Sequence, residues 1–357
     1  MKNSISQVDL FGKELRLIKL PSTRYQGSKY KIVKWIWEKI EKFSFNKFLD
    51  AFGGTGVVAY YMKRMGKEVH YNDYLKFNYY IGLALIENNS VILSEEKVKS
   101  IIEKSTNMIY KNFIFNTFKD IYYSDDENEW LDIVIKNIES LQDIYEKYLA
   151  YYALFQSSLV KRPFNLFHRK NLYIRNADVK RSFGNKRTWD TPFEVHFLNF
   201  VNEINNLIFN NNRNNKSFNL DVFELSENYD LVYIDPPYTS QKGVTVDYLD
   251  FYHFLEGIVN YEVWDNMIDY RTKHKRLKRI YNPWNDPKKI KNIFREVIYK
   301  FKDSIICISY RSDGIPSIEE IKSFIKEYKR NIDVYYFNKY RYVLSNDDTQ
   351  EVLIIGW

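Results

Sequence analysis

The chain has 357 residues, 45% of them hydrophobic, which is enough for a sizeable core in one large domain or two smaller ones. One cysteine excludes an internal disulfide, no Cys/His cluster has the spacing of a zinc site, and no apolar run is long enough to span a membrane. The net charge of +7 suits an acidic partner such as nucleic acid, and the N-terminus lacks the apolar core of a signal peptide. We therefore expect a cytoplasmic protein that requires no metal.

The N-terminal segment Arg24-Tyr25-Gln26-Gly27-Ser28-Lys29 combines charged, aromatic and glycine residues. This combination suits contact with an anion or a carboxylate. For this segment taken alone, the favoured interpretation of Lys29 is the first turn of an amphipathic helix, because Ile32, Val33 and Ile36 follow with helical spacing.

The next segment predicts a β-α-β unit with a glycine-rich turn. A strand over residues 48–52 runs into Gly53-Gly54-Thr55-Gly56, an amphipathic helix follows over residues 57–65, and a second strand over residues 68–72 ends at Asp73. Ligands of open α/β sheets bind beyond the carboxyl ends of the strands, where glycines let the backbone come close and Asp73 can accept hydrogen bonds from ribose hydroxyls. For the glycines alone, a tight turn without a ligand is the alternative.

Five further strands are expected in the second half of the chain. They cover residues 217–220, 230–234, 304–309, 332–337 and 351–355, and the last two form an antiparallel hairpin across a polar turn at residues 346–348. Apolar strands flanked by helices predict an α/β fold with a mostly parallel, seven-stranded, Rossmann-like sheet.

The strand signal disappears between residues 83 and 216, where a helical stretch precedes the basic, irregular residues 161–187. We therefore predict a sheet domain made of residues 1–82 and 217–357, and an inserted, mainly helical lobe made of residues 83–216. A second basic stretch begins at Arg271, and it fits either a phosphate contact or a plain exposed helix face.

Asp235-Pro236-Pro237-Tyr238 directly follows the apolar strand at residues 230–234. The prolines end the strand, stiffen the turn and remove two backbone donors. A carboxylate beside a free carbonyl forms a pocket for an –NH2 group, and the tyrosine offers a face for stacking. Two acceptors that grip the amine hydrogens would aim the nitrogen lone pair at an electrophilic methyl group. A strand-end turn with an incidental aspartate is the alternative.

Taken in order, these motifs resemble the adenine-specific DNA methyltransferases of the Dam-like (D12) class. The resemblance covers both ends of the chain but not the insertion. It rests on Tyr25-Gln26-Gly27-Ser28-Lys29, Asp50-Ala51-Phe52-Gly53-Gly54-Thr55-Gly56, Asp73, Asp221, Asp235-Pro236-Pro237-Tyr238 and Ile308-Ser309-Tyr310-Arg311-Ser312-Asp313-Gly314. The family usually has proline where this chain has Ala51, whose backbone can still make the turn.

The resemblance implies the cofactor S-adenosylmethionine and a role for each matched residue. Those expected to bind the cofactor are Tyr25 and Lys29 at its methionine end, Asp50, Phe52, Gly53, Gly54 and Gly56 around it, Asp73 at its ribose and Asp221 at its adenine amine. In the catalytic turn, Asp235 and the Pro236 carbonyl would accept from the target amine, Pro237 would stiffen the turn, and Tyr238 would stack on the target base.

The resemblance also places DNA recognition in the insertion. A base inside a duplex cannot reach such a pocket, so the enzyme must flip it out and hold the DNA in a basic groove. Phosphate contacts are predicted for the cations of the irregular stretch, with ordinary solvated surface as the alternative: Lys161, Arg162, Arg169, Lys170, Arg175, Arg181, Lys186 and Arg187.

Three alternative functions keep the same fold: methylation of cytosine N4 in DNA, methylation of adenine in RNA, and an inactive DNA-binding module. Aspartate at position 235 favours DNA, the motif order favours adenine, and the intact Asp235 and Tyr238 argue against an inactive module. We therefore expect a site-specific enzyme that transfers methyl from S-adenosylmethionine to N6 of adenine in double-stranded DNA by base flipping and direct SN2 attack. It would serve a restriction-modification or other DNA-modification system, in the first case with a companion endonuclease.

Overall fold

The computed structural model describes residues 19–22, 24–179, 186–239, 247–337 and 349–357, and the short N-terminal strands β1 (Gln7–Val8) and β2 (Glu14–Leu15). Two predictions fall outside these residues: the polar turn at residues 346–348 and the DNA contact of Arg181. Among the helices described, none is both long and apolar enough to cross a membrane.

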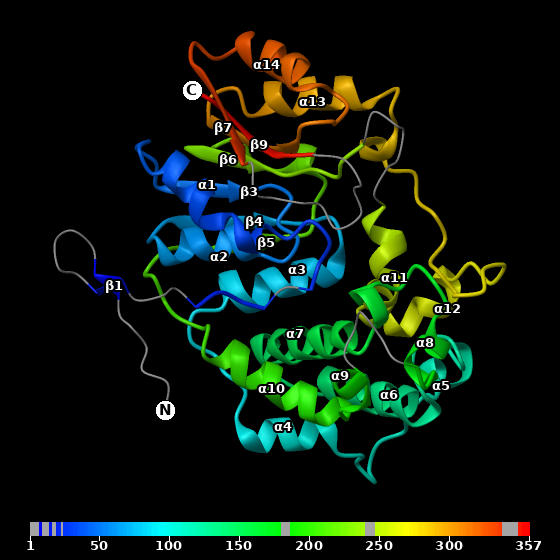
Figure 1. Cartoon of the computed structure of the whole chain (residues 1–357). Helices are drawn as coiled ribbons and strands as arrows, with labels where there is room; N and C mark the ends of the chain where they lie inside the picture. The colour runs from blue at the N-terminus through cyan, green and yellow to red at the C-terminus, as the bar shows by residue number, and fades with distance from the viewer. Residues whose placement is uncertain are drawn as a thin grey trace.

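A seven-stranded sheet, with the order β5-β4-β3-β6-β7-β9-β8, forms the centre of the upper body in Figure 1. Its strands are β3 (Lys47–Asp50), β4 (Glu68–Asn72), β5 (Lys216–Phe218), β6 (Leu231–Ile234), β7 (Ile305–Arg311), β8 (Ile332–Phe337) and β9 (Glu351–Gly356). The first five pair in parallel, whereas β9 runs antiparallel to both β7 and β8. The predicted sheet and its antiparallel C-terminal hairpin are confirmed.

Helices cover both faces of this sheet, which explains why strands inside it such as β6 and β9 are mostly apolar and fully buried. One face packs against α1 (Val33–Ile40), α2 (Val57–Arg64) and α3 (Lys76–Gly82), and the other against α13 (Ile290–Lys300) and α14 (Ile318–Lys326). Alternate residues of β6 point to opposite sides: Leu231 and Tyr233 join the first core, and Val232 and Ile234 join the second. Cys307 is fully buried in the first core, as a packed thiol should be.

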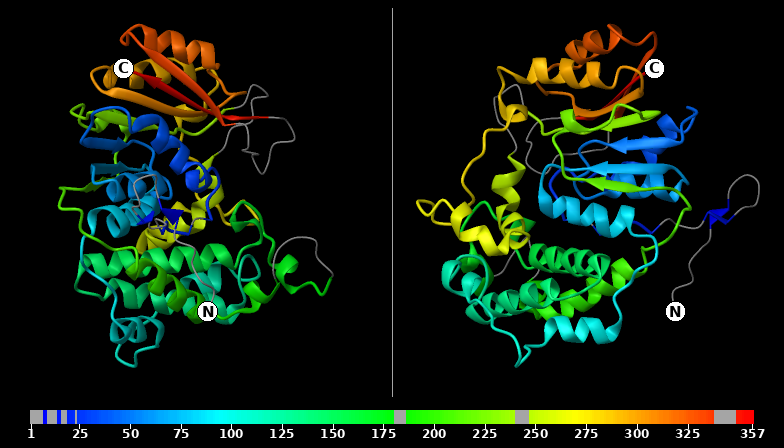
Figure 2. Two further views of the ribbon diagram at one scale, coloured as in Figure 1. Left: turned by 60° about the vertical axis from the view of Figure 1, so that its left-hand side comes forward. Right: turned by 180° about the vertical axis from the view of Figure 1, so that it is seen from behind.

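A helical lobe lies below α3 in Figures 1 and 2, at the opposite end of the molecule from α14. Its helices are α4 (Glu95–Ile102), α5 (Phe113–Thr117), α6 (Asp125–Glu139), α7 (Ile144–Val160), α8 (Leu172–Asn176), α9 (Lys186–Asp190) and α10 (Phe193–Asn205). The short helices α8 and α9 occupy part of the stretch that the sequence predicted to be irregular.

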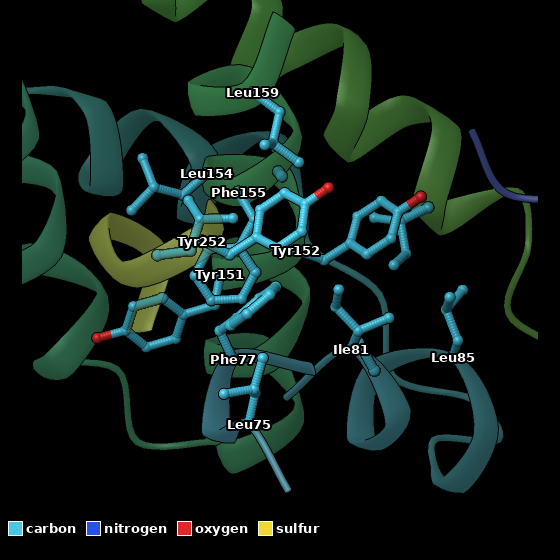
Figure 3. Close-up of a cluster of buried hydrophobic side chains, with 14 of the residues drawn as sticks. Leu75, Phe77, Ile81, Leu85, Tyr151, Tyr152, Leu154, Phe155, Leu159 and Tyr252 are labelled. Atoms are coloured by element: carbon cyan, nitrogen blue, oxygen red, sulfur yellow. The ribbon is translucent and has the colours of Figure 1, made fainter. Parts of the chain in front are cut away.

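Two helices that follow the catalytic turn, α11 (Tyr248–Ile258) and α12 (Trp264–Met267), also pack on this lobe. Phe254 of α11 stacks on Phe167 with ring centroids 5.0 Å apart, and Trp264 of α12 packs 4.9 Å from the ring of Phe118. Figure 3 shows the cluster of buried side chains through which α3, α7 and α11 meet. The lobe and the catalytic turn are therefore joined through α11, a link that residues 83–216 alone did not suggest.

Candidate active site

A cavity lies beyond the carboxyl ends of β3, β4 and β6 and is lined by most of the residues predicted to bind the cofactor. The predicted residues in its wall are Tyr25, Lys29, Asp50, Phe52, Gly53, Gly54, Asp73, Asp221, Asp235 and Pro237. Gly56, Pro236 and Tyr238 lie outside the lining. Residues about 200 positions apart in the chain meet here because neighbouring parallel strands end at one edge of the sheet.

The glycine-rich turn encloses the ring of Tyr71, a residue that the sequence analysis missed. A Cβ atom built on Gly53 would lie 1.9 Å from Cε2 of Tyr71, so a side chain at Gly53 has no room. The Tyr71 hydroxyl donates to the carbonyl oxygens of Gly54 (2.7 Å) and Asn78 (3.1 Å). The ring of Tyr71 thus occupies the space that a side chain at position 53 would need. Nothing in the sequence distinguishes Tyr71 from an ordinary core residue of a strand.

Asp73 holds the glycine turn from the end of β4. Its carboxylate accepts from the backbone N–H groups of Gly54 and Leu75, each at 2.8 Å. Burial raises the pKa of Asp73 to about 6, although these two N–H groups oppose the shift. Asp221 differs, because it is exposed, and its side chain accepts from the backbone N–H of Phe223 at 3.0 Å.

Asp50 is a buried acceptor in the wall of the cavity. Asp50 is only 1% exposed, and its Oδ1 atom has no hydrogen-bond partner among the described residues. Burial, reinforced by the charge of Asp235, raises the pKa of Asp50 well above its ordinary value. Buried polar atoms are nearly always hydrogen-bonded, so this oxygen suits a donor supplied by a ligand.

The carboxylate of Asp235, the residue predicted to be catalytic, is paired with a buried lysine. The Lys29 Nζ atom lies 2.9 Å from Oδ1 and 2.8 Å from Oδ2 of Asp235, 2.8 Å from the hydroxyl of Tyr238 and 3.5 Å from Oε1 of Glu351. Burial raises the pKa of Asp235, the ammonium of Lys29 lowers it, and the carboxylate of Glu351 raises it. Lys29 was expected to contact the methionine end of a cofactor, whereas in this structure it forms an ion pair with Asp235.

Glu351, at the start of β9, is fully buried and accepts a hydrogen bond from the hydroxyl of Ser309 on β7. The sequence analysis used it only as the first residue of a strand. A glutamate that opens an otherwise apolar strand was the one available signal, but its distance from Lys29 in the chain hid the contact.

Tyr238 is packed inward in this structure. It is 5% exposed, its ring meets that of Tyr310 edge-on at 5.4 Å, and its hydroxyl donates to Asp235. The expectation that Tyr238 stacks on a target base therefore requires the ring to leave this packing.

Two aromatic residues that the sequence analysis did not assign to the site, Tyr248 and Trp284, also line the cavity. Tyr25 stacks on Tyr252 and Tyr248 of α11, with ring centroids 4.3 and 5.3 Å apart, and the backbone N–H of Gln26 donates to the Tyr252 hydroxyl at 2.7 Å. Phe52 meets Trp284 edge-on at 4.9 Å. Only the tertiary fold brings α11 and the segment at Trp284 to the glycine turn.

The sequence as a whole is similar to a family of known proteins. Residues 25–324 match the model of the D12 class N6 adenine-specific DNA methyltransferase family. The chain belongs to this family. The predicted resemblance is thereby confirmed, and with it the methylation of adenine N6 in DNA. Among the described residues, no group of three or more His, Cys, Asp or Glu side chains is placed to hold a metal ion.

Several curated methyltransferases are similar to this D12-class enzyme. The type II methyltransferase M2.HphI of Haemophilus parahaemolyticus is 29% identical over 324 residues, which cover 88% of this chain and 90% of the relative. The modification methylase StsI of Streptococcus sanguinis is 30% identical and M.FokI of Planomicrobium okeanokoites 27% identical, each over 85% of this chain. The alignments cover only 46% and 47% of those two relatives, so this chain spans about half their length.

Three of the cations predicted to contact DNA are buried in the helical lobe of the methyltransferase. Lys161 lies 2.8 Å from Glu127, and Arg175 donates to both carboxylate oxygens of Glu127 at 2.7 and 2.8 Å. Arg162 is 1% exposed and donates to the carbonyl oxygens of Tyr122 and Leu166. These side chains hold the lobe together, which corrects the prediction that they contact phosphates. Four others are exposed: Arg169, Lys170, Lys186 and Arg187.

Replacing Glu127 with alanine is expected to lower the free energy of unfolding by about 3 kcal/mol, because it leaves buried Lys161 and Arg175 without their shared anion. Urea denaturation measures the effect. Glu129→Ala on the same helix is the control, since Glu129 pairs with exposed Lys104 and should cost at most about 1 kcal/mol. Equal losses in the two variants would contradict the structural role of Glu127.

Proposed function

We propose that this D12-class methyltransferase binds S-adenosylmethionine in the cavity beyond β3, β4 and β6, with the catalytic turn at one side. The observation that carries the proposal is the Oδ1 atom of Asp50, which has no hydrogen-bond partner within the described part of the chain and is a buried acceptor in the same wall as Asp73 and Asp235. S-adenosylmethionine has an ammonium group and two ribose hydroxyls, all of which donate hydrogen bonds. The carboxyl groups of Asp50 and Asp73 can accept hydrogen bonds from them. Tyr25 and Phe52 would supply apolar contacts, and Asp221 would accept from the adenine amine at the rim.

The catalytic turn would prepare the target amine for attack. Asp235 and the Pro236 carbonyl accept one hydrogen each from the adenine N6 amine, which turns the nitrogen lone pair away from the ring. When bound, the cofactor supplies a methyl group activated by its sulfonium sulfur. Attack by N6 on this methyl group would release the cofactor as a neutral thioether, and N6 would then lose a proton to solvent, while Asp235 and the Pro236 carbonyl hold the amine. Lys29 orients Asp235 through its two contacts of 2.8 and 2.9 Å.

The substrate would be double-stranded DNA from which the target adenine is flipped out. Target recognition is assigned to the inserted residues 83–216, and Arg169, Lys170, Lys186 and Arg187 remain candidates for phosphate contacts. Because the substrate is DNA, we place the enzyme in the cytoplasm. Its relatives are named type II methyltransferases and modification methylases, which supports a role beside a companion restriction endonuclease.

Labelling with tritiated S-adenosylmethionine tests this function directly. Purified protein should transfer label to adenine in duplex DNA, and modification-sensitive sequencing of DNA from expressing cells should show N6-methyladenine in one sequence context. Label in RNA but not in DNA would contradict the substrate, and label on cytosine would contradict the acceptor.

The affinity for S-adenosylmethionine is expected to fall below pH 6. Burial raises the pKa of Asp73 to about 6. Below that pH, Asp73 in the free protein is protonated, and binding of the ribose must displace this proton. One displaced proton weakens binding by at most about tenfold per pH unit below 6, and well above 6 the effect vanishes. Calorimetry between pH 5 and 8 measures the slope. Asp73→Asn, which keeps the shape but cannot titrate, should flatten it, and an equal slope in both proteins would exclude Asp73 as the cause.

A further inference from the structure

We propose that a basic hairpin after α12, residues 267–279, contacts the phosphates of the DNA duplex beside the target base. This inference rests on the proposed function, because it concerns how the duplex is held at that active site. The sequence offered this second basic stretch as either a phosphate contact or an exposed helix face, and the structure shows a hairpin there in place of a helix. Of the cations predicted in the first basic stretch, residues 161–187, three are buried. The surface charge for DNA must therefore come in part from elsewhere.

Backbone hydrogen bonds and buried side chains hold the hairpin in place. Ile268 and Leu277 form an antiparallel bridge, the N–H of Asp269 donates to the carbonyl of Arg276 at 2.8 Å, and the N–H of Lys278 donates to that of Met267 at 2.7 Å. Ile268 and Leu277 are 2% and 3% exposed and belong to the main core. The two arms are thus fixed by packing, and the tip between them projects beside α12 in Figures 1 and 2.

The charge of the hairpin is strongly positive and points outward. Residues 269–279 contain six lysines and arginines against one aspartate. The side chain of Arg271 is 89% exposed, although it also pairs with Asp269, and Lys273 is exposed and forms no ion pair with any described residue. Lys278 and Arg279 are exposed as well. A dense, exposed set of cations on a rigid arm suits a polyanion such as a phosphate backbone.

The base of the hairpin is tied to the active site through α11. Asp250 pairs with Arg279 at 3.0 Å and with Arg276 at 3.5 Å, while its neighbours Asp247, Tyr248 and Leu249 line the cavity. From Arg279 the chain continues directly into residues 280–284, which also line the cavity. The C-terminal arm of the hairpin is therefore linked to the wall of the cavity both through Asp250 and through the chain that follows it.

A second segment brings further cations next to this arm. The Tyr122 hydroxyl donates to the carbonyl of His274 in the hairpin at 2.8 Å and to that of Phe167 at 2.6 Å. The N–H of Phe167 in turn donates to the carbonyl of Phe251 on α11 at 2.9 Å. The loop that carries exposed Arg169 and Lys170 thus lies beside the hairpin, which places two further cations near it.

The variant Arg271→Gln/Lys273→Gln/Lys278→Gln tests the inference. Each phosphate contact contributes about 0.9 to the slope of log affinity against log salt, so the slope should fall by about 2 to 3. Affinity for duplex DNA should fall at least about tenfold in 0.1 M salt, with a matching rise in the KM for DNA. The kcat at saturating DNA and the affinity for S-adenosylmethionine should stay unchanged, because neither depends on these side chains.

The matched control is Lys99→Gln/Lys326→Gln/Arg330→Gln, which removes the same charge from exposed positions on α4 and on and beyond α14, at the two ends of the molecule. A third protein, Arg271→Lys/Lys273→Arg/Lys278→Arg, keeps the charge and should bind like the wild type. The proposal is overturned if the first variant and the control lose the same affinity, or if the charge-keeping protein loses as much as the first. Failure of the wild type to methylate DNA would instead refute the proposed function.

Discussion

Replacing Asp235 with asparagine is expected to lower kcat for methyl transfer by at least about 10²–10³-fold while the fold survives. The carboxylate accepts a hydrogen from the target amine, whereas an amide can turn an N–H donor toward it and repel it. The Asp235 carboxylate is held in a fixed orientation, because Lys29 contacts both of its oxygens and two prolines stiffen the turn. Single-turnover assays with tritiated cofactor measure the loss, and circular dichroism checks the fold.

The control for Asp235→Asn lies at the opposite end of the same strand. Asp230 accepts from the backbone N–H groups of Asn46 and Lys47 at 2.7 and 2.8 Å and lies far from the catalytic turn. Asp230→Asn should therefore reduce stability slightly and leave kcat within about twofold, since only a lost or weakened hydrogen bond of roughly 1 kcal/mol is involved. If Asp235→Asn kept wild-type kcat, the proposed grip on the amine would be wrong.

Replacing Gly53 with alanine is expected to destroy cofactor binding and to destabilise the protein by about 1–3 kcal/mol. The added methyl group would overlap the Tyr71 ring at 1.9 Å. That ring cannot move aside easily, because it is fully buried and its hydroxyl is held by two carbonyl oxygens. Relief requires the glycine turn to shift, and the turn carries the hydrogen bond from Gly54 to Asp73.

Gly54→Ala is the matched comparison. At Gly54 the nearest atom to an added Cβ is Cε1 of Tyr25 at 3.6 Å, so the methyl group fits, and only the backbone angle φ of +50° is unfavourable. We expect a loss of about 1 kcal/mol and weakened, but measurable, binding. Thermal unfolding and calorimetry with S-adenosylmethionine compare the two variants. A larger effect at Gly54 than at Gly53 would show that backbone angle, rather than the Tyr71 ring, makes the turn depend on glycine.

The site was predictable where neighbouring residues carry the chemistry. Asp235-Pro236-Pro237-Tyr238 and the turn from Asp50 to Gly56 combine a strand end with an unusual local composition, so their position at the sheet edge follows from the strand pattern alone. Tyr71 and Trp284 carry no such local signal, and the only one at Glu351 is an acidic residue that opens an apolar strand. Each is an ordinary strand or loop residue until the fold brings it against Gly53, Phe52 or Lys29.

The buried cations illustrate a second limit. Lys161, Arg162 and Arg175 look like surface charge in a basic stretch, and no local pattern separates them from exposed Arg169 and Lys170. Their burial depends on partners elsewhere in the lobe, above all Glu127 on α6. An ionised side chain is buried only where such partners neutralise it, and that arrangement is a property of the packed lobe.

By itself, therefore, the sequence determined the strands along the chain, the glycine turn, the Asp235–Tyr238 turn at a strand end and the family, whereas the order of the strands in the sheet came from the structure. These depend on hydrophobic patterning and on short motifs, both of which are local. The tertiary structure alone decided that Lys29 pairs with Asp235 beside Glu351, that α11 joins the lobe to the pocket, and that the hairpin at residues 267–279 rather than Lys161 or Arg162 presents charge to solvent. These features arise from contacts between residues far apart in the chain, whose free energy is gained only when the whole core packs.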